Sequence, residues 1–164
     1  MRKSTLKYLH LTLKHKWFVF LAGRKIGTSM WRLIIHDWSK FLPSELPYYG
    51  RQFCGDAKDP EGYIQCWVKH QNRHDHHWEY HIPRTGCVGY KNNEPVQMSD
   101  EAILEMIADW MGASRAYAGR WAEKGKWKWF ENHWARIRLH PETRRKVKNV
   151  LIKLELIGGE DNGD

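Results

Sequence analysis

One stretch of the chain, residues 99–118, reads SDEAILEMIADWMGASRAYA. Ser99 is a typical helix N-cap, and the carboxylates of Asp100 and Glu101 in the first turn interact favourably with the helix dipole. The apolar side chains that follow recur at helical spacing. The stretch therefore predicts an apolar helix over about 100–118.

An acidic residue, Asp109, lies deep inside this predicted helix. Its neighbours on the same helical face include Glu105 and the small residues Gly112 and Ala113. An unpaired carboxylate buried there would cost on the order of several kcal/mol. Asp109 therefore needs a metal ion or a basic partner, and an ordinary salt bridge to Arg115 is the alternative.

Before this helix, four histidines fall within eight residues: His70, His74, His76 and His77. A helix is predicted to start at Pro60, after Asp59 as its cap, and to run into these histidines. On one helix, the spacing of 70, 74 and 77 places three imidazoles on the same face. Protonated imidazoles would repel one another there, so either a bound cation or a solvated face is expected.

A second pair, His36-Asp37, falls in a helix predicted over about 29–40. Adjacent helical side chains point about 100° apart, so both can reach an ion that lies between their directions. The alternative is a carboxylate at a helix end next to a hydrogen-bonded core histidine. Imidazole and carboxylate groups from three predicted helices thus point to one metal site.

The remaining pattern predicts a single all-α compact domain of about six helices over 1–157, followed by a disordered acidic tail over 158–164. The chain has 164 residues, 41% of them hydrophobic, which suffices for one core. Pro43, Ser44 and Glu45 suggest a short helical start. The stretch from there to Pro60 reads as mostly loop, and 81–98 reads as a long loop. The other predicted helices cover about 5–22, 126–139 and 141–156.

The net charge of +8 favours an anionic partner such as a nucleotide, nucleic acid or anionic lipid surface. The longest apolar run, Trp17–Ala22, is far shorter than the roughly 20 residues that cross a bilayer, so no membrane span is expected. Cys54, Cys66 and Cys87 form no C-x-x-C pair, which predicts reduced thiols in a cytoplasmic protein.

The string His36-Asp37-Trp38-Ser39-Lys40 resembles the His-Asp-x-Gly-Lys motif of HD-domain metal-dependent phosphohydrolases, especially the HD-GYP branch. Ser39 stands where that motif has glycine, and no Gly-Tyr-Pro signature follows the histidines. The chain is also similar to small uncharacterised phage and bacterial proteins with a His-Asp-x-Ser-Lys-Phe segment, which would place it in the host cytoplasm if phage-encoded.

The resemblance implies one or two divalent metals, such as Mn, Fe, Co, Ni or Zn, with Mg as an alternative. By position, the implied ligands are His15, His36, Asp37, His70, His76 or His77, and Asp109. His10 remains an alternative to the first of these, and the choice between the adjacent pair of histidines depends on a bend after Asp75.

The resulting hypothesis is a phosphohydrolase that attacks a nucleotide or related phosphate ester with metal-activated hydroxide. Asp37 would bridge two ions, and Lys40 would neutralise charge on the phosphate. Weaker candidates for substrate contact are Lys69, Arg73 and Arg84. Two acidic residues, Glu79 and Glu105, are expected to orient the metal ligands by hydrogen bonds without binding the metal themselves.

Two other functions remain open at this point. The C-terminal third interleaves basic residues with tryptophans, which suits a non-catalytic nucleic-acid-binding protein, although ordinary core packing also explains the tryptophans. Those residues are Lys124, Lys126, Lys128, Arg136, Arg138, Arg144, Arg145, Lys146 and Lys148, with Trp127, Trp129 and Trp134. The third possibility is a di-iron oxygenase, because HD-like scaffolds also include such enzymes.

Overall fold

The computed structural model describes residues 2–85, 89 and 91–158, and this part of the chain is helical without any strand. Its elements are α1 (Lys3–Ile26), α2 (Met30–Ile35), the 3₁₀ helix η1 (Trp38–Phe41), α3 (Leu46–Cys54), α4 (Pro60–Gln71), η2 (Trp78–His81), α5 (Asp100–Tyr117), α6 (Lys128–His133), η3 (Trp134–Arg136) and α7 (Pro141–Lys153). The prediction of one all-α domain is confirmed, with seven α-helices in these residues rather than about six.

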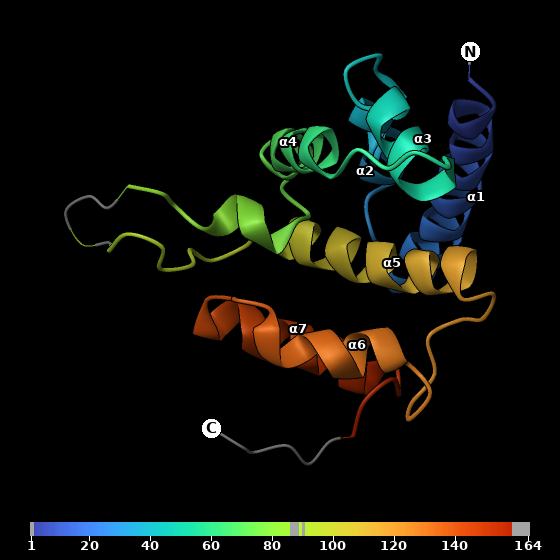
Figure 1. Ribbon diagram of the computed structural model, residues 1–164. Helices are drawn as coiled ribbons and strands as arrows, with labels where there is room; N and C mark the ends of the chain where they lie inside the picture. Colours follow the sequence, from blue (N-terminus) through green and yellow to red (C-terminus); the bar gives the residue numbers. More distant parts are fainter. Residues whose placement is uncertain (1, 86–88, 90, 159–164) are drawn as a thin grey trace.

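Helix α5 runs through the middle of the molecule, with α1–α4 on one side and α6 and α7 on the other (Figure 1). Its N-cap is the predicted one, because the Ser99 hydroxyl accepts a hydrogen bond from the backbone N–H of Ala102 at 3.2 Å. Side chains from several faces of α5 are buried, among them Ile103, Met106 and Ile107. The larger core is therefore assembled around this helix.

Helix α1 buries a stripe of side chains that recurs every three or four residues: Thr5, Tyr8, Thr12, His15, Val19 and Ala22. Part of this stripe packs on α5 where the second helix carries glycine. A Cβ atom on Gly112 would lie 2.6 Å from the backbone nitrogen of Val19 and 2.6 Å from its Cγ2 atom. The absence of a side chain at Gly112 thus lets the two backbones approach closely.

The predicted helix over 29–40 is wrong, because α2 ends at Ile35. His36 has an extended backbone, and Asp37 has a left-handed one with φ of 54°. Aspartate tolerates this region better than most residues. The pair therefore lies in a sharp turn between α2 and η1.

The prediction that the stretch from Pro47 to Pro60 is mostly loop is also wrong, since α3 occupies Leu46–Cys54. Pro47 lies in the first turn of this helix, where proline is tolerated because the first N–H groups have no helical partner. Proline starts a helix here rather than preventing one.

Helix α4 begins at Pro60 after the Asp59 cap, as predicted, but ends at Gln71, before most of the histidines. At its end, the Asn72 side chain donates to the carbonyl of Val68 at 2.7 Å and competes with continuation of the helix. His74, His76 and His77 therefore lie in turns rather than on the predicted helical face.

The C-terminal part differs from the prediction in one element. The expected helix over 126–139 is a short α6 followed by η3, whereas the next helix begins at the predicted Pro141. Of the predicted tail, residues 159–164 lie outside the described residues. Cys87 also lies outside them, while Cys54 and Cys66 are free thiols.

A search of the described helices for one with the length and apolar character needed to span a membrane finds none.

We predict that Gly112→Ala destabilises the protein by about 2 kcal/mol or more, because the new methyl group would overlap the backbone of α1 at Val19. Urea denaturation followed by circular dichroism measures the change. Ser114→Ala is the control, since its hydroxyl donates only to the exposed carbonyl of Arg120 and should matter by less than about 1 kcal/mol. Equal stability of the two variants would contradict the close packing.

Candidate metal centre

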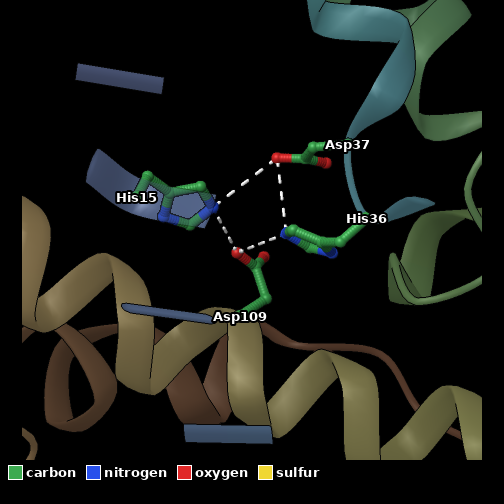
Figure 2. A group of neighbouring side chains, drawn as sticks. All are labelled: His15, His36, Asp37 and Asp109. Atoms are coloured by element: carbon green, nitrogen blue, oxygen red, sulfur yellow. Dashed lines mark ion pairs between the residues drawn. The ribbon is translucent and has the colours of Figure 1, made fainter. Parts of the chain in front are cut away.

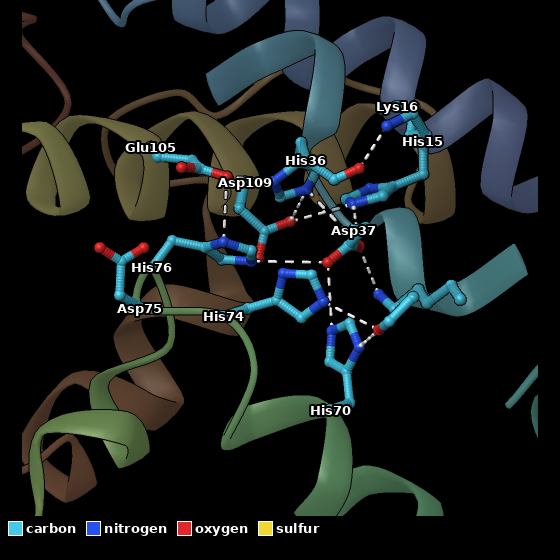
Figure 3. Close-up of polar contacts among 12 residues, drawn as sticks. His15, Lys16, His36, Asp37, His70, His74, Asp75, His76, Glu105 and Asp109 are labelled. Carbon is cyan, nitrogen blue, oxygen red and sulfur yellow. Dashed lines mark hydrogen bonds and ion pairs between the residues drawn. The ribbon is translucent and has the colours of Figure 1, made fainter. Parts of the chain in front are cut away.

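The predicted ligand side chains meet in one region between α1, α4 and α5, and Figure 3 shows all of them except His77. They come from α1, from the turn after α2, from α4 and the turns that follow it, and from α5: His15, His36, Asp37, His70, His76, His77 and Asp109. We call these residues the candidate centre.

One half of the candidate centre contains two imidazoles and two carboxylates (Figure 2). The Nε2 atom of His15 lies 3.0 Å from Oδ1 of Asp109 and 3.5 Å from Oδ2 of Asp37. The Nε2 atom of His36 lies 3.5 Å from the same Asp37 oxygen and 3.6 Å from the same Asp109 oxygen. Arg115, the alternative partner of Asp109, instead donates to a backbone carbonyl beyond the end of α5.

The other half is built around the second oxygen of Asp37. Its Oδ1 atom lies 3.1 Å from Nε2 of His70 and 3.5 Å from Nε2 of His76. A nitrogen of His77 also falls within 4.8 Å of ligand atoms of Asp37 and His76. The two oxygens of one carboxylate thus face two separate groups of imidazoles, and both of the adjacent histidines lie at the site.

Several of these ligand atoms are buried and make no hydrogen bond within the described part of the chain. They are Oδ1 of Asp37 and the Nε2 atoms of His15, His36, His70, His76 and His77. Buried polar atoms in proteins nearly always have a partner. Lone pairs of nitrogen and oxygen that converge without a donor are the arrangement that a cation satisfies.

Lys40 lies next to the candidate centre, with its ammonium 2.6 Å from Oδ2 of Asp37 and its side chain largely buried. It also stacks over the ring of Tyr49 at 5.7 Å. Lys40 was predicted to contact the phosphate of the substrate. In the structure its ammonium pairs with the carboxylate of Asp37.

Glu105 contacts two of the imidazole rings on the side that faces away from the centre. Its Oε1 atom accepts from Nδ1 of His36 at 2.9 Å and lies 3.0 Å from Nδ1 of His76. Its Oε2 atom accepts from Nε of Arg32 at 2.6 Å, and the same guanidinium also pairs with Asp75. With Nδ1 bound to a carboxylate, each ring turns its Nε2 atom towards the centre.

A second buried carboxylate, that of Glu45, holds the ring of His70 in the same way, although no motif in the sequence marks Glu45 as part of the site. Its Oε2 atom lies 3.1 Å from Nδ1 of His70 and accepts from the hydroxyl of Ser39 at 2.9 Å. Ser39 also contacts Nε2 of His74 at 2.8 Å, so the residue that replaces the motif glycine ties three side chains together. Arg73 donates to Glu45 at 2.6 Å.

The electrostatics of the centre follow from burial opposed by close charge partners. Burial alone would raise the pKa of Asp37, but His36, Lys40 and His70 outweigh it and hold that pKa well below its usual value. Burial likewise opposes protonation of His15, yet the neighbouring carboxylates of Asp109 and Asp37 raise its pKa.

The pKa values of His74 and His77 shift in the opposite direction. Burial and the neighbouring His70 lower the pKa of His74 to about 3. Burial, together with His76 and His70, also lowers the pKa of His77 well below its usual value. Both rings are therefore neutral and retain lone pairs at physiological pH.

Comparison with known protein families gives a match over most of the chain. Residues 4–153 fit the model of a family of unknown function, DUF5662. The chain belongs to the DUF5662 family. No curated protein and no solved structure matches it. The matched range of this DUF5662 protein contains every residue of the candidate centre.

A cavity of about 610 Å³ opens next to the centre in this DUF5662 protein. Asp109, His76 and His77 line it, and the rest of its lining comes from α4, η2, α5, α6 and η3 and from the segments that follow α5 and η3. Glu79, expected behind a ligand, lines the cavity instead, and burial raises the pKa of its carboxyl. Four described residues predicted to touch substrate are absent from the lining: Lys40, Lys69, Arg73 and Arg84.

We predict that Glu105→Gln lowers the free energy of unfolding of the metal-free protein by about 3 kcal/mol or more, because it leaves Arg32 without its buried charge partner. Denaturation in the presence of a chelator measures this. Glu123→Gln breaks an exposed pair with Lys126 and serves as the control, for which little change is expected. If both variants unfold at the same urea concentration, Glu105 does not carry the assigned role.

Proposed function

We propose that the protein is a metal-dependent phosphohydrolase that acts on a nucleotide or a related phosphate ester. The observation that carries the proposal is the candidate centre itself. Imidazole and carboxylate atoms from distant parts of the chain converge there within a few ångströms, and several of the buried ones have no hydrogen-bond partner among the described residues.

The donor atoms fit a divalent first-row transition metal. The centre offers imidazole nitrogens and carboxylate oxygens and no thiolate, a set that suits Mn, Fe, Co, Ni or Zn better than Mg. His15, His36, Asp37 and Asp109 would hold one ion. For a second ion, a ligand atom of Asp37 converges either with those of His76 and His77 or with those of His70 and His74.

When bound, such cations act as Lewis acids and lower the pKa of a water molecule, so that water can attack phosphorus near neutral pH. The protein's own side chains orient the imidazole ligands. Glu105 and Glu45 fix the imidazole rings through their Nδ1 atoms, and Lys40 offsets part of the charge of Asp37. The cavity leads substrate to the edge of the centre where Asp109, His76 and His77 lie.

Phosphate as the reacting group is supported by the charge of the cavity and of the chain. Basic side chains lining the cavity are Arg120, Lys126, Lys128 and Arg136, and the chain carries a net charge of +8. Cations arranged around a developing negative charge stabilise the transition state of phosphoryl transfer.

The nucleic-acid-binding alternative receives less support from the tryptophans that suggested it. Trp127 is buried and Trp134 packs against the core, where the guanidinium of Arg144 lies 4.3 Å from its ring. Of the three, Trp129 is the exposed one. A di-iron oxygenase would use the same ligands and would differ from a phosphohydrolase only in its reaction. The measurement of ester hydrolysis described below distinguishes the two functions.

We predict that His15→Ala reduces the amount of metal bound after the protein is loaded with Mn²⁺ or Zn²⁺ and desalted, because it removes a buried ligand atom. Elemental analysis measures the stoichiometry, with two ions per chain expected for the native protein. His10→Ala is the matched control, since His10 lies on the exposed side of the same helix. A native protein that retains no metal would contradict the proposal.

We predict that the double variant His36→Ala with Asp37→Ala loses hydrolysis of bis(p-nitrophenyl) phosphate while keeping much of its helicity. Phosphate-ester hydrolysis and circular dichroism are measured on metal-loaded samples. Full activity of the double variant would reject the chemistry. Bound iron with an oxygen-dependent absorption change and no ester hydrolysis would favour the oxygenase instead.

A further inference from the structure

The cavity beside the candidate centre has an aromatic wall. Trp110 and Trp127 line it as buried side chains, whereas Trp129 lines it as an exposed one. The ring of Trp129 lies 5.7 Å from that of Trp110 and 6.4 Å from that of Trp127. Such a wall presents apolar ring surface to whatever enters.

The ring of Trp129 is held in place before any ligand arrives. His133 stacks on it with ring centroids 5.1 Å apart and an interplanar angle of 16°, and Nδ1 of His133 lies 2.6 Å from the backbone carbonyl of Trp129. Both residues line the cavity. A fixed ring that is exposed on a cavity wall is suited to stack against a flat ligand group.

The same cavity carries more positive than negative charge. Four basic side chains line it, Arg120, Lys126, Lys128 and Arg136, against the two carboxylates of Glu79 and Asp109. Asp109 belongs to the candidate centre and already faces His15 at 3.0 Å. Lys126 pairs with Glu123, which leaves the other three cations as the main source of attraction for an anion.

Resting on the proposed function, we propose that this cavity binds a nucleoside diphosphate or triphosphate, with the base on the aromatic wall and the phosphates among the basic side chains. A volume of about 610 Å³ lies within the roughly 300–1,000 Å³ of small-molecule sites. One phosphate occupies the end near Asp109, His76 and His77. The cations of α6 and η3, Lys128 and Arg136, hold a further one.

The test is isothermal titration of the full chain in its metal-free form, in which hydrolysis cannot deplete the ligand. ADP is compared with AMP, adenosine and ribose 5-phosphate. ADP should bind about tenfold more tightly than AMP, by analogy with one additional charge-assisted contact. Adenosine, which lacks phosphate, and ribose 5-phosphate, which lacks the base, should both bind more weakly than AMP.

Variants then test which side chains bind the phosphates of the ligand and which bind its base. Lys128→Ala with Arg136→Ala should weaken ADP binding at least about tenfold. Lys124→Ala removes an exposed charge from the same part of the chain outside the cavity lining and should leave binding unchanged. Trp129→Ala should weaken ADP about tenfold and ribose 5-phosphate hardly at all, because only the base stacks.

The inference is overturned if ADP binds no better than adenosine, if Lys124→Ala weakens binding as much as the double variant does, or if single-stranded RNA binds and ADP does not. Its failure is separable from that of the proposed function. Hydrolysis of bis(p-nitrophenyl) phosphate without ADP binding overturns the inference alone. ADP binding by a protein that takes up no metal supports the inference and overturns the hydrolase.

Discussion

The close approach of α1 and α5 at Gly112 is the constraint on which the candidate centre depends. Val19 packs on this glycine at a distance that no side chain would allow. One turn before each contact point, α1 carries His15 and α5 carries Asp109, and their ligand atoms lie 3.0 Å apart. A wider separation of the helices would leave these two groups on opposite sides of a gap. Helix packing and ligand geometry are thus a single property of the fold.

Burying so many ionisable groups is costly, and the structure offsets the cost with a layer of charge partners outside the candidate centre. Arg32 compensates Glu105, Arg73 compensates Glu45, and Lys40 compensates Asp37. Charged groups in a weakly polar interior are tolerated only when paired and hydrogen-bonded. The partners also fix the rings, because each outer carboxylate takes the Nδ1 atom and leaves Nε2 facing inward.

Much of the fold, and the residue types that converge at the candidate centre, could be predicted from sequence because they depend on local signals. The cap at Ser99 and the spacing of apolar side chains define α5. Histidine and aspartate are recognisable in the sequence as residue types that can bind a metal ion. The rest depends on tertiary contacts. The turn at Asp37 breaks a pattern that reads as one helix. Pro47 and two glycines suggest a loop where α3 forms, because the proline lies in the first turn of that helix. The histidines after α4 reach the centre through turns and not along one helical face.

The buried stripe of α1 has a consequence for how this family can diverge. Each residue added to a helix rotates everything after it by about 100°. A single insertion between His15 and Val19 would therefore either swing the imidazole out of the interior or carry the packing surface away from Gly112. Substitutions on the exposed side of α1 do not change the directions in which His15 and Val19 point. Homologous chains are therefore expected to vary in residue type along this helix while conserving the number of residues between its ligand and its contact point.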